Sequence, residues 1–510
     1  RRREMALIYN ATFDKNTRKL TFEDRAGNEI YSFTVPERTP AVDDITKPLT
    51  FKATQDGSTV SLTKNGSPSG AFQTSMDGGN TWVDYTIDTA ISLNIGDEVS
   101  FRAKSNRTSE QRYNDYFYFV MTGKIEAWHN VMSLYRTNDF ATYESVMDYA
   151  FTSLFKGCTS LTKAPALPAT TLAYNCYGYM FNGCTSLAKA PVLPATTLDP
   201  YCYDYMFNGC TSLAKAPALP ATTLDLYCYR SMFNGCASLA KAPALPATTL
   251  AHSCYYGMFD GCASLTEAPE LPATTLDRYC YNGMFQNCTS LTKAPELQAT
   301  TLADNCYYGM FKGCTSLAKA PALPATTLAH SCYHFMFNGC TSLTEAPALP
   351  ATTLADNCYI SMFNGCASLA KAPALPATTL ANDCYPYMFN GCTSLTKAPE
   401  LPATTLATYC YNSMFKGCTS LTKAPELPAT TLAQRCYIDM FNGCSSLNEV
   451  RCQMPSSYSS SDVSSYARDW LSGVSSTGTF YTNADAHWPS GVSGIPQNWT
   501  RVNINDYPTT

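Results

Sequence analysis

Residues 174–180 read YNCYGYM, and close copies of this stretch recur ten more times along the 510-residue chain. Each copy keeps the Cys-Tyr pair and the Met while the letters around them change, as in PYCYDYM and QRCYIDM. One column of cysteines runs from Cys176 to Cys436 in steps of 26 residues, and a second runs from Cys158 to Cys444 with the same step. Such a period is typical of a solenoid, in which each unit buries its face only against its neighbours.

Each repeat separates into a fixed side and a varied side. Spacings of four residues would place the fixed side chains on one stripe of a helix, so we predict a short helix in every coil. The predicted core residues are Leu172, Cys176, Met180, Phe181 and Cys184. The remaining positions of this segment would face water, and they are the ones that change between coils. We call them the variable face: Tyr174, Asn175, Gly178, Tyr179 and their equivalents in the other coils.

The other side of the coil reads as a short extended segment. Leu161, Ala164 and Leu167 would point inward, and stacked coils would pair these segments in parallel. Because proline lacks the N–H that a ladder needs, the APALP and APELP sequences predict strands of two or three residues and an irregular sheet. Pro386 lies inside an expected helix and predicts a distorted segment in its coil.

The array resembles the BspA-like leucine-rich repeats of bacterial surface proteins, known from gut Bacteroidetes and their phages. The resemblance is carried by MFNGCTSL at 180–187 and its near-copies, by the LP after each extended segment, and by the Trp-bearing tail. It implies a right-handed α/β solenoid of about twelve coils over residues 139–452. It also implies binding of surfaces rather than catalysis. The strand departs from the expected IxIP pattern, since it reads APALP or APELP here.

The segments before the repeats differ from them in composition. Residues 1–4, RRRE, precede Met5 and are predicted to be an extension. Residues 5–42 hold TRKLTFED and NEIYSFTV joined by RAGN, which predicts a β-hairpin. Residues 43–138 alternate in the manner of a β-sandwich.

The segment after the repeats, residues 453–510, begins rich in serine. Three bulky side chains then follow, and they predict a small cap on the open end of the solenoid. These are Trp470, Trp488 and Trp499.

The overall composition limits the classes of partner. A net charge of -5 and a pI near 5.6 argue against a nucleic-acid-binding surface. No apolar run approaches the roughly 20 residues of a membrane-spanning helix. Nothing after Met5 resembles a signal peptide, so we expect a soluble chain. If the chain is exported, we expect that its leader has been removed or that it travels by a route without one.

The 24 cysteines allow three interpretations, which are free buried thiols, disulfides or metal sites. The two cysteines of one coil are about 12 Å apart along a helix, too far for a disulfide. Five scattered histidines and the lack of a Cys-x-x-Cys sequence argue against metal. We predict free buried thiols, which behave as small hydrophobes, with no metal and no cofactor. Cys452 belongs to neither column and is predicted to be exposed and reactive.

Two further patterns have structural interpretations. The stretch SMDGGNTW, Ser75–Trp82, matches the Asp-box of sialidase propellers, but a single copy predicts only a tight hairpin turn. Lysines recur in one column, either to attract an anionic glycan or, as we favour, to keep the array soluble. They are Lys163, Lys189, Lys215, Lys241, Lys293, Lys319, Lys371, Lys397 and Lys423.

The variable face is rich in Tyr, Asn, Asp, His, Arg, Ser and Gly, the mixture that antibody loops use for adaptable contacts. Its tyrosines predict an exposed aromatic stripe suited to sugar rings or protein surfaces. Neutral drift of exposed positions is the alternative explanation. The candidate ligand-binding residues are Tyr174, Tyr179, Tyr201, Tyr205, Tyr227, Arg230, Tyr256, Tyr279, Tyr308, His334, Tyr387 and Tyr409.

No nucleophile–base pair, phosphate loop or metal cluster stands out, so no catalytic residue is predicted. We expect a non-catalytic, extracellular recognition or adhesion protein of a bacterial cell surface, with a protein or glycan on a cell as its partner. A phage tail fibre or receptor-binding protein on a virion and a structural spacer or self-assembling fibre are the alternatives. The N-terminal β-region is the candidate element for oligomerisation.

Overall fold

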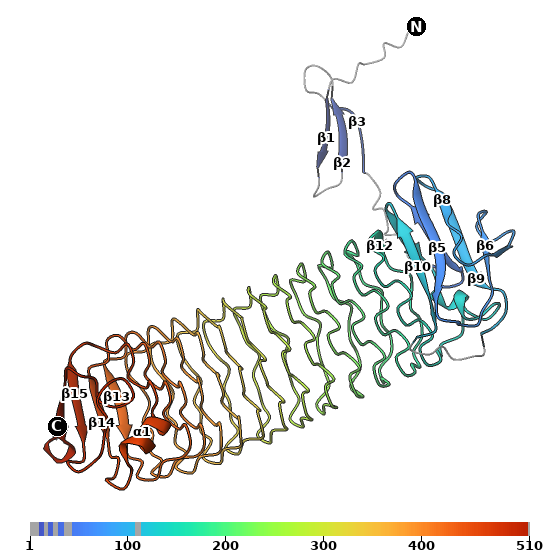
Figure 1. Ribbon diagram of the computed structural model, residues 1–510. Helices are drawn as coiled ribbons and strands as arrows, with labels where there is room; N and C mark the ends of the chain where they lie inside the picture. The colour runs from blue at the N-terminus through green and yellow to red at the C-terminus, as the bar shows by residue number, and fades with distance from the viewer. Residues whose placement is uncertain (1–9, 15–18, 24–28, 35–42, 108–113, 508–510) are drawn as a thin grey trace. The chain divides into compact units, whose positions relative to one another are not determined.

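The computed structural model describes residues 10–14, 19–23, 29–34, 43–107 and 114–507 (Figure 1). They divide into two compact units, Arg1–Asp44 and Ile45–Thr510.

The first unit contains an antiparallel sheet of three strands, in the order β1-β2-β3. They are β1 (Asn10–Asp14), β2 (Lys19–Glu23) and β3 (Glu29–Thr34). The pairing of β2 with β3 confirms the two predicted hairpin strands, and β1 adds a third. The RRRE segment and the RAGN turn lie outside the described residues.

The second unit begins with two facing β-sheets, ordered β10-β5-β8 and β12-β11-β4-β9-β6-β7. Phe51, Phe101 and Phe119 meet edge-on between them, with ring centroids 4.6, 5.3 and 5.6 Å apart. This β-region therefore has a packed aromatic core, as its alternating sequence predicted. Its strands are β4 (Leu49–Ala53), β5 (Ser58–Asn65), β6 (Phe72–Ser75), β7 (Val83–Tyr85), β8 (Ile91–Leu93), β9 (Glu98–Ala103), β10 (Tyr116–Thr122) and β11 (Ile125–Trp128).

The SMDGGNTW stretch forms the tight hairpin between β6 and β7, as predicted. The Asp77 carboxylate accepts hydrogen bonds from the Thr81 hydroxyl at 2.6 Å, the Thr81 N–H at 2.9 Å and the Ser75 hydroxyl at 2.7 Å. These bonds, led by the one from the Thr81 hydroxyl, hold the pKa of Asp77 well below its usual range. The carboxylate therefore shapes the turn.

The six-stranded sheet continues into the repeats. Strand β12 (Leu161–Lys163) belongs to the first coil and pairs in parallel with β11. Phe119 of β10 stacks on Phe155 of that coil with ring centroids 5.4 Å apart, and its carbonyl accepts a hydrogen bond from the Cys158 thiol. The β-region thus covers the first coil and shares one continuous core with the repeats.

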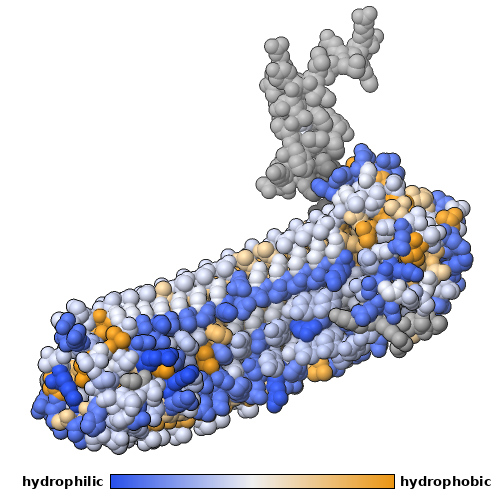
Figure 2. Space-filling model, in the orientation of Figure 1, coloured by the Kyte–Doolittle hydropathy of each residue, from blue (hydrophilic) through white to orange (hydrophobic). Residues whose placement is uncertain are grey.

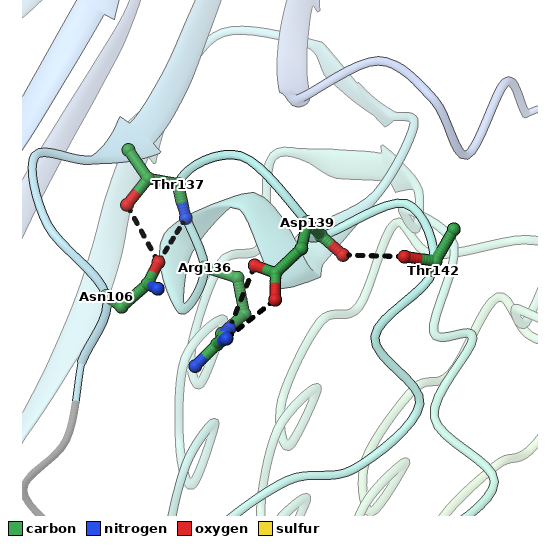
Figure 3. A network of polar contacts seen from close by, with 5 residues as sticks. All are labelled: Asn106, Arg136, Thr137, Asp139 and Thr142. Atoms are coloured by element: carbon green, nitrogen blue, oxygen red, sulfur yellow. Dashed lines mark hydrogen bonds and ion pairs between the residues drawn. The ribbon is translucent and has the colours of Figure 1, made fainter.

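Polar contacts fix the chain where it passes from the β-region to the first coil, just after the 3-10 helix η1 (Val131–Leu134). Arg136 forms an ion pair with Asp139 at 2.6 Å, and the Thr137 N–H and hydroxyl both donate to Asn106 (Figure 3). Two segments distant in sequence are held together there by side-chain bonds.

Each coil contains a chain of overlapping turns where the sequence predicted a helix. In the second coil, the N–H groups of Cys176, Gly178 and Met180 donate to carbonyls three residues earlier. The N–H groups that alternate with them, such as those of Tyr177 and Tyr179, donate to carbonyls of the next coil at 2.7–3.0 Å. An α-helix would keep these bonds within one segment. The predicted helix, and with it the α part of the fold class, is therefore wrong, since the α-helix found among the described residues, α1 (Ser460–Tyr466), lies outside the repeats.

The turns require a left-handed backbone at every fourth residue. In the second coil these residues are Asn175 (φ 51°), Tyr179 (φ 58°) and Gly183 (φ 75°). The first two places fall on the variable face, where non-glycine residues in this conformation cost roughly 1–2 kcal/mol each. Bonds to the neighbouring coils therefore override local preference at the variable face.

The predicted core residues are buried, which confirms their assignment. Leu172 is 6 % exposed, and the other four side chains are at 0 %. Equivalent rings lie directly on one another, as Tyr177 does on Tyr203 at 5.9 Å and Phe181 on Phe207 at 5.5 Å, with nearly parallel planes. Each such pair adds about 0.5–1.5 kcal/mol beyond burial. The same register produces narrow rows of similar hydropathy on the surface (Figure 2).

All 24 cysteines are free and buried, which confirms the prediction for the 23 cysteines of the two columns. In one column each thiol donates to a phenylalanine carbonyl one coil back, as Cys184 does to Phe155 at 3.0 Å. Burial raises the thiol pKa values, that of Cys176 to about 12.

The exposed position predicted for Cys452 is wrong. It lies in β14 (Glu449–Cys452), whose alternation turns it inward; the side chain is 1 % exposed, and burial raises its pKa to about 12.

We expect none of the 24 thiols to react with DTNB in the native protein at about pH 8, because the thiolate is the reactive species and burial suppresses it. Unfolding in guanidinium should release all 24, which absorbance titration would count. Labelling of one thiol per native chain, mapped to Cys452 by peptide mass, would contradict this burial.

The extended segments form the irregular sheet that their prolines predicted. Most neighbours touch through single bridges, such as Lys215 with Lys241. Leu161, Ala164 and Leu167 are nevertheless buried, as expected.

Pro386 disturbs its coil less than expected. Its carbonyl still accepts from Ser361 in the preceding coil, and Tyr387 still donates to Asn412 in the next, both at 2.9 Å. In other coils the N–H group at the place of Pro386 donates to a carbonyl three residues earlier in the same coil, and not to the next coil. The bonds between coils therefore survive.

A parallel four-stranded sheet ends the array, in the order β13-β14-β15-β16. Trp470 is fully buried beside it and takes the next place in the ladder of rings, 6.0 Å from Tyr437 and 6.2 Å from Phe441. Trp488 stacks on Trp470 at 5.0 Å, so indole rings cover the last coil. The elements not yet given are β13 (Lys423–Leu427), β15 (Gly478–Thr482), β16 (Trp499–Asn503) and η2 (Ile504–Asp506).

Candidate binding surface

The variable face has a constant backbone and changing side chains. Its left-handed residues donate to the next coil in one coil after another, as Tyr179 does to Asp204 at 2.7 Å and Tyr205 to Arg230 at 2.8 Å. The side chains carried by these places range from glycine to phenylalanine, aspartate and arginine. The bonds between coils therefore position a series of unlike side chains on one strip.

Most candidate tyrosines are half-buried, which corrects the predicted exposed stripe. They cover one another, because Tyr174 lies 5.3 Å from Tyr201, and Tyr201 lies 4.8 Å from Tyr227. Tyr179 stacks on Tyr205 at 5.0 Å. The candidate aromatic residues that remain exposed are Tyr256 at 38 %, Tyr279 at 36 % and Tyr387 at 40 %.

An ion pair between a buried aspartate and a partly exposed arginine lies against the tyrosines of the third and fourth coils. Asp204 is 1 % exposed and accepts from the Nε of Arg230 at 2.8 Å and from its Nη2 at 2.7 Å. Burial raises the pKa of Asp204 to about 6, against the lowering influence of Arg230. The guanidinium carbon lies 4.7 Å from the ring centroid of Tyr227 and 5.2 Å from that of Tyr205. Arg230 is thus fixed by a carboxylate and by two aromatic rings.

Beside this ion pair the surface has a hollow of about 320 Å³, which we call the Arg230 hollow. His252 lies on its wall and shares a hydrogen bond with the Tyr227 hydroxyl at 3.0 Å. The hollow is lined by Tyr205, Tyr227, Arg230, His252, Ser253, Tyr256 and Tyr279.

Five of these seven lining residues were sequence candidates, and His252 and Ser253 were missed. Asp204, the buried partner of Arg230, was also missed. A signal for Asp204 was present, because opposite charges stand at the same place in successive repeats, 26 residues apart. Tyr179 and Tyr201 contact the lining residues Tyr205 and Tyr227, and Tyr174 is one ring farther away, against Tyr201.

The other candidates form separate contacts farther along the array. His334 packs against Tyr308 with ring centroids 4.8 Å apart, and burial lowers the His334 pKa to about 4, so it is neutral near pH 7. Tyr409 lies under Arg435, whose guanidinium carbon is 5.4 Å from its ring centroid. The structure does not bring Tyr308, His334, Tyr387 or Tyr409 into the Arg230 hollow.

A comparison with family models identifies the array. The family model described as the BspA type leucine rich repeat region (6 copies) matches the chain over five overlapping ranges, residues 140–266, 204–344, 252–387, 307–448 and 360–474. The chain belongs to this family. Proteins with BspA-type repeats are typically exposed on surfaces and typically non-enzymatic, and their fold is a solenoid-like repeat. Neither a curated protein nor a solved structure matches the chain.

The opposite side of this BspA-type array carries the lysine column. Grooves of about 400–690 Å³ separate neighbouring extended segments there. The largest has Lys397 and Lys423 on its walls together with Glu400 and Glu426. In this groove the balanced charge favours the solvated interpretation of the lysine column over an anionic ligand. The groove that contains Lys215 and Lys241 has no carboxylate among its lining residues.

Two searches of the described residues bear on other kinds of site. Within these residues, no group of three or more His, Cys, Asp and Glu side chains is placed to hold a metal ion. No helix in this part of the BspA-type chain has the length and hydropathy to cross a bilayer.

Proposed function

We propose that this protein is a non-catalytic, extracellular recognition or adhesion protein that binds a host, bacterial or glycan surface through its variable face. One observation carries the proposal: side chains vary where the backbone is held constant by bonds between coils. The Tyr and Phe columns inside the array remain nearly unchanged over the same repeats. A rigid scaffold that presents rigid aromatic and adaptable polar side chains has the properties of a recognition surface.

The surface of a bacterial cell is the proposed location, and the family's typical exposure supports it. The surface of a virion, as a fibre or receptor-binding protein, is the alternative location. Immunogold electron microscopy of producing cells and of purified phage particles separates the two by where the label collects.

The binding test compares two variants of the full chain on cells and on immobilised mucin. The first replaces the face tyrosines with residues that the chain itself uses at the same places: Tyr201→Ser, Tyr205→Ser, Tyr227→Ser, Tyr279→Ser and Tyr256→Asn. The control carries five changes on the opposite side: Lys215→Gln, Lys241→Gln, Lys293→Gln, Lys319→Gln and Lys371→Gln.

We expect the tyrosine variant to lose binding by more than about tenfold, because stacked aromatic contacts are worth roughly 0.5–1.5 kcal/mol each. The lysine variant should bind as the parent does. Equal binding by both variants would refute the role of the variable face. A parent protein that binds no surface would leave a structural spacer or self-assembling fibre, which the continuous ring ladders also suit.

A further inference from the structure

We propose that the Arg230 hollow is a subsite for one neutral pyranose sugar. The inference rests on the proposed recognition function and names the class of ligand at one place on the variable face.

The hollow offers aromatic faces to a ligand. Tyr256 and Tyr279 are more exposed than the stacked tyrosines beside them, and both line the hollow. The π-face of an aromatic ring is electron-rich, while the C–H face of a pyranose is apolar and weakly positive. A sugar ring can therefore replace water over these tyrosines at little desolvation cost.

Polar groups converge on the same hollow. Asp204 engages the Nε and Nη2 atoms of Arg230, which leaves Nη1 as the donor without a described partner. His252 and the Tyr227 hydroxyl form a hydrogen bond with each other at 3.0 Å. Each group can form a further hydrogen bond with a ligand. Such donors and acceptors suit hydroxyl groups, each of which both donates and accepts.

The charge of the site favours a neutral ligand over an acidic one. The positive charge of Arg230 is already balanced by a carboxylate within 2.8 Å. A sialic acid, a uronic acid or a phosphate would therefore meet a site with no net positive charge.

The size of the hollow limits the ligand to a small unit. A volume of about 320 Å³ is at the lower end for small-molecule sites. This suits a single sugar residue, and the open side allows the rest of a glycan to extend into water.

The test uses the full-length protein and methyl glycosides, observed by saturation-transfer NMR and titrated for a dissociation constant. One arm contains neutral hexosides and N-acetylhexosaminides, and the other contains glucuronic and sialic acid glycosides. Tyr279→Ser and Tyr256→Asn should weaken neutral binding by roughly tenfold, the value of one aromatic contact. Tyr409→Ser is the matched control, because Tyr409 holds the same place as Tyr279 in a coil outside the hollow, and it should change nothing.

Asp204→Asn tests the charge argument. With Arg230 no longer balanced, acidic glycosides should gain at least about fivefold in affinity while neutral ones keep theirs. The proposal is overturned if no neutral glycoside binds, if acidic glycosides bind the parent more tightly, or if Tyr279→Ser and Tyr409→Ser behave alike. If surface binding still depends on the variable face in those cases, only the sugar assignment fails and a protein ligand remains. If the parent protein binds neither cells nor mucin, the proposed recognition function itself is refuted.

Discussion

Replacing Arg230 with alanine is expected to lower the free energy of unfolding by about 3–5 kcal/mol near pH 7.5, because it leaves the carboxylate of Asp204 buried and unpaired. Asp204 is 1 % exposed and accepts hydrogen bonds from two of the three guanidinium nitrogens of Arg230, at 2.8 and 2.7 Å. Urea denaturation followed by tryptophan fluorescence measures the loss.

The deficit should shrink as the pH falls. The folded-state pKa of Asp204 is about 6, above the ordinary value of 3.8, so the folded protein binds this proton more tightly than the unfolded chain. Protonation therefore favours folding, and this contribution is fully present below about pH 3.8 and lost as the pH rises through 6. Because Arg230 lowers the pKa of Asp204, removing Arg230 raises that pKa further, and the stabilisation from protonated Asp204 then persists to a higher pH.

The control for this prediction is the double variant Asp204→Asn, Arg230→Asn. It removes both charges and uses a residue that the chain carries at the same place in Asn282 and Asn412. Most of the lost stability should return. A single Arg230→Ala variant as stable as the parent at pH 7.5 would show that the Asp204 carboxylate is not buried as described.

Replacing Phe285 with alanine is expected to destabilise the middle of the array by about 3–5 kcal/mol. This ring is fully buried and stacks on Phe259 at 5.6 Å and on Phe311 at 5.7 Å. In a repeat protein each unit is stabilised mainly by its nearest neighbours, so one missing ring weakens two interfaces at once.

Hydrogen exchange is the sharpest measurement of this effect. The amides of the sixth coil should lose protection first, and the two flanking halves should unfold in separate steps. Lys293→Ala, an exposed change in the extended segment that follows in the same repeat, should leave the protection pattern unchanged. Uniform loss of protection along the whole chain would contradict nearest-neighbour stabilisation.

The repeat and its core could be predicted from the sequence because they depend on periodicity alone, and the family was indicated by the resemblance of MFNGCTSL and its near-copies. A side chain that recurs every 26 residues meets its own copy, so Cys176, Met180 and Phe181 had to stack whatever the local backbone. The irregular sheet was also predictable, because Pro165 and Pro168 lack N–H groups wherever they lie.

The turns could not be predicted in the same way. Spacings of four residues place Leu172, Cys176 and Met180 on one side of a helix, and they do the same in a chain of turns that repeats every four residues. The helix and the chain of turns differ at the residues with a left-handed backbone. Asn175 and Tyr179 occupy two of these positions, and their residue types give little indication of that conformation. The clearest signal was Gly257, Gly283 and Gly309, which put glycine at one of those places in three successive coils.

The candidate site was predicted only in part because burial depends on neighbours. The tyrosines of the variable face were identified correctly by variation, yet their stacking on adjacent coils hides most of their area. Asp204 was missed because a lone aspartate on a varied strip reads as solvated until its partner, Arg230, is seen beneath the same rings.

The uniform joint between coils has a consequence for how such a protein changes over generations. Since every coil bonds to the next through the same backbone groups, deleting one whole repeat creates an interface equivalent to those it removes. Because the repeats are near-identical in amino-acid sequence, gain or loss of a whole 26-residue unit keeps the register of every remaining contact. Descendant proteins can therefore differ in the length of the array and in which side chains of the variable face are neighbours. The β-region before the first coil and the cap after the last one are retained.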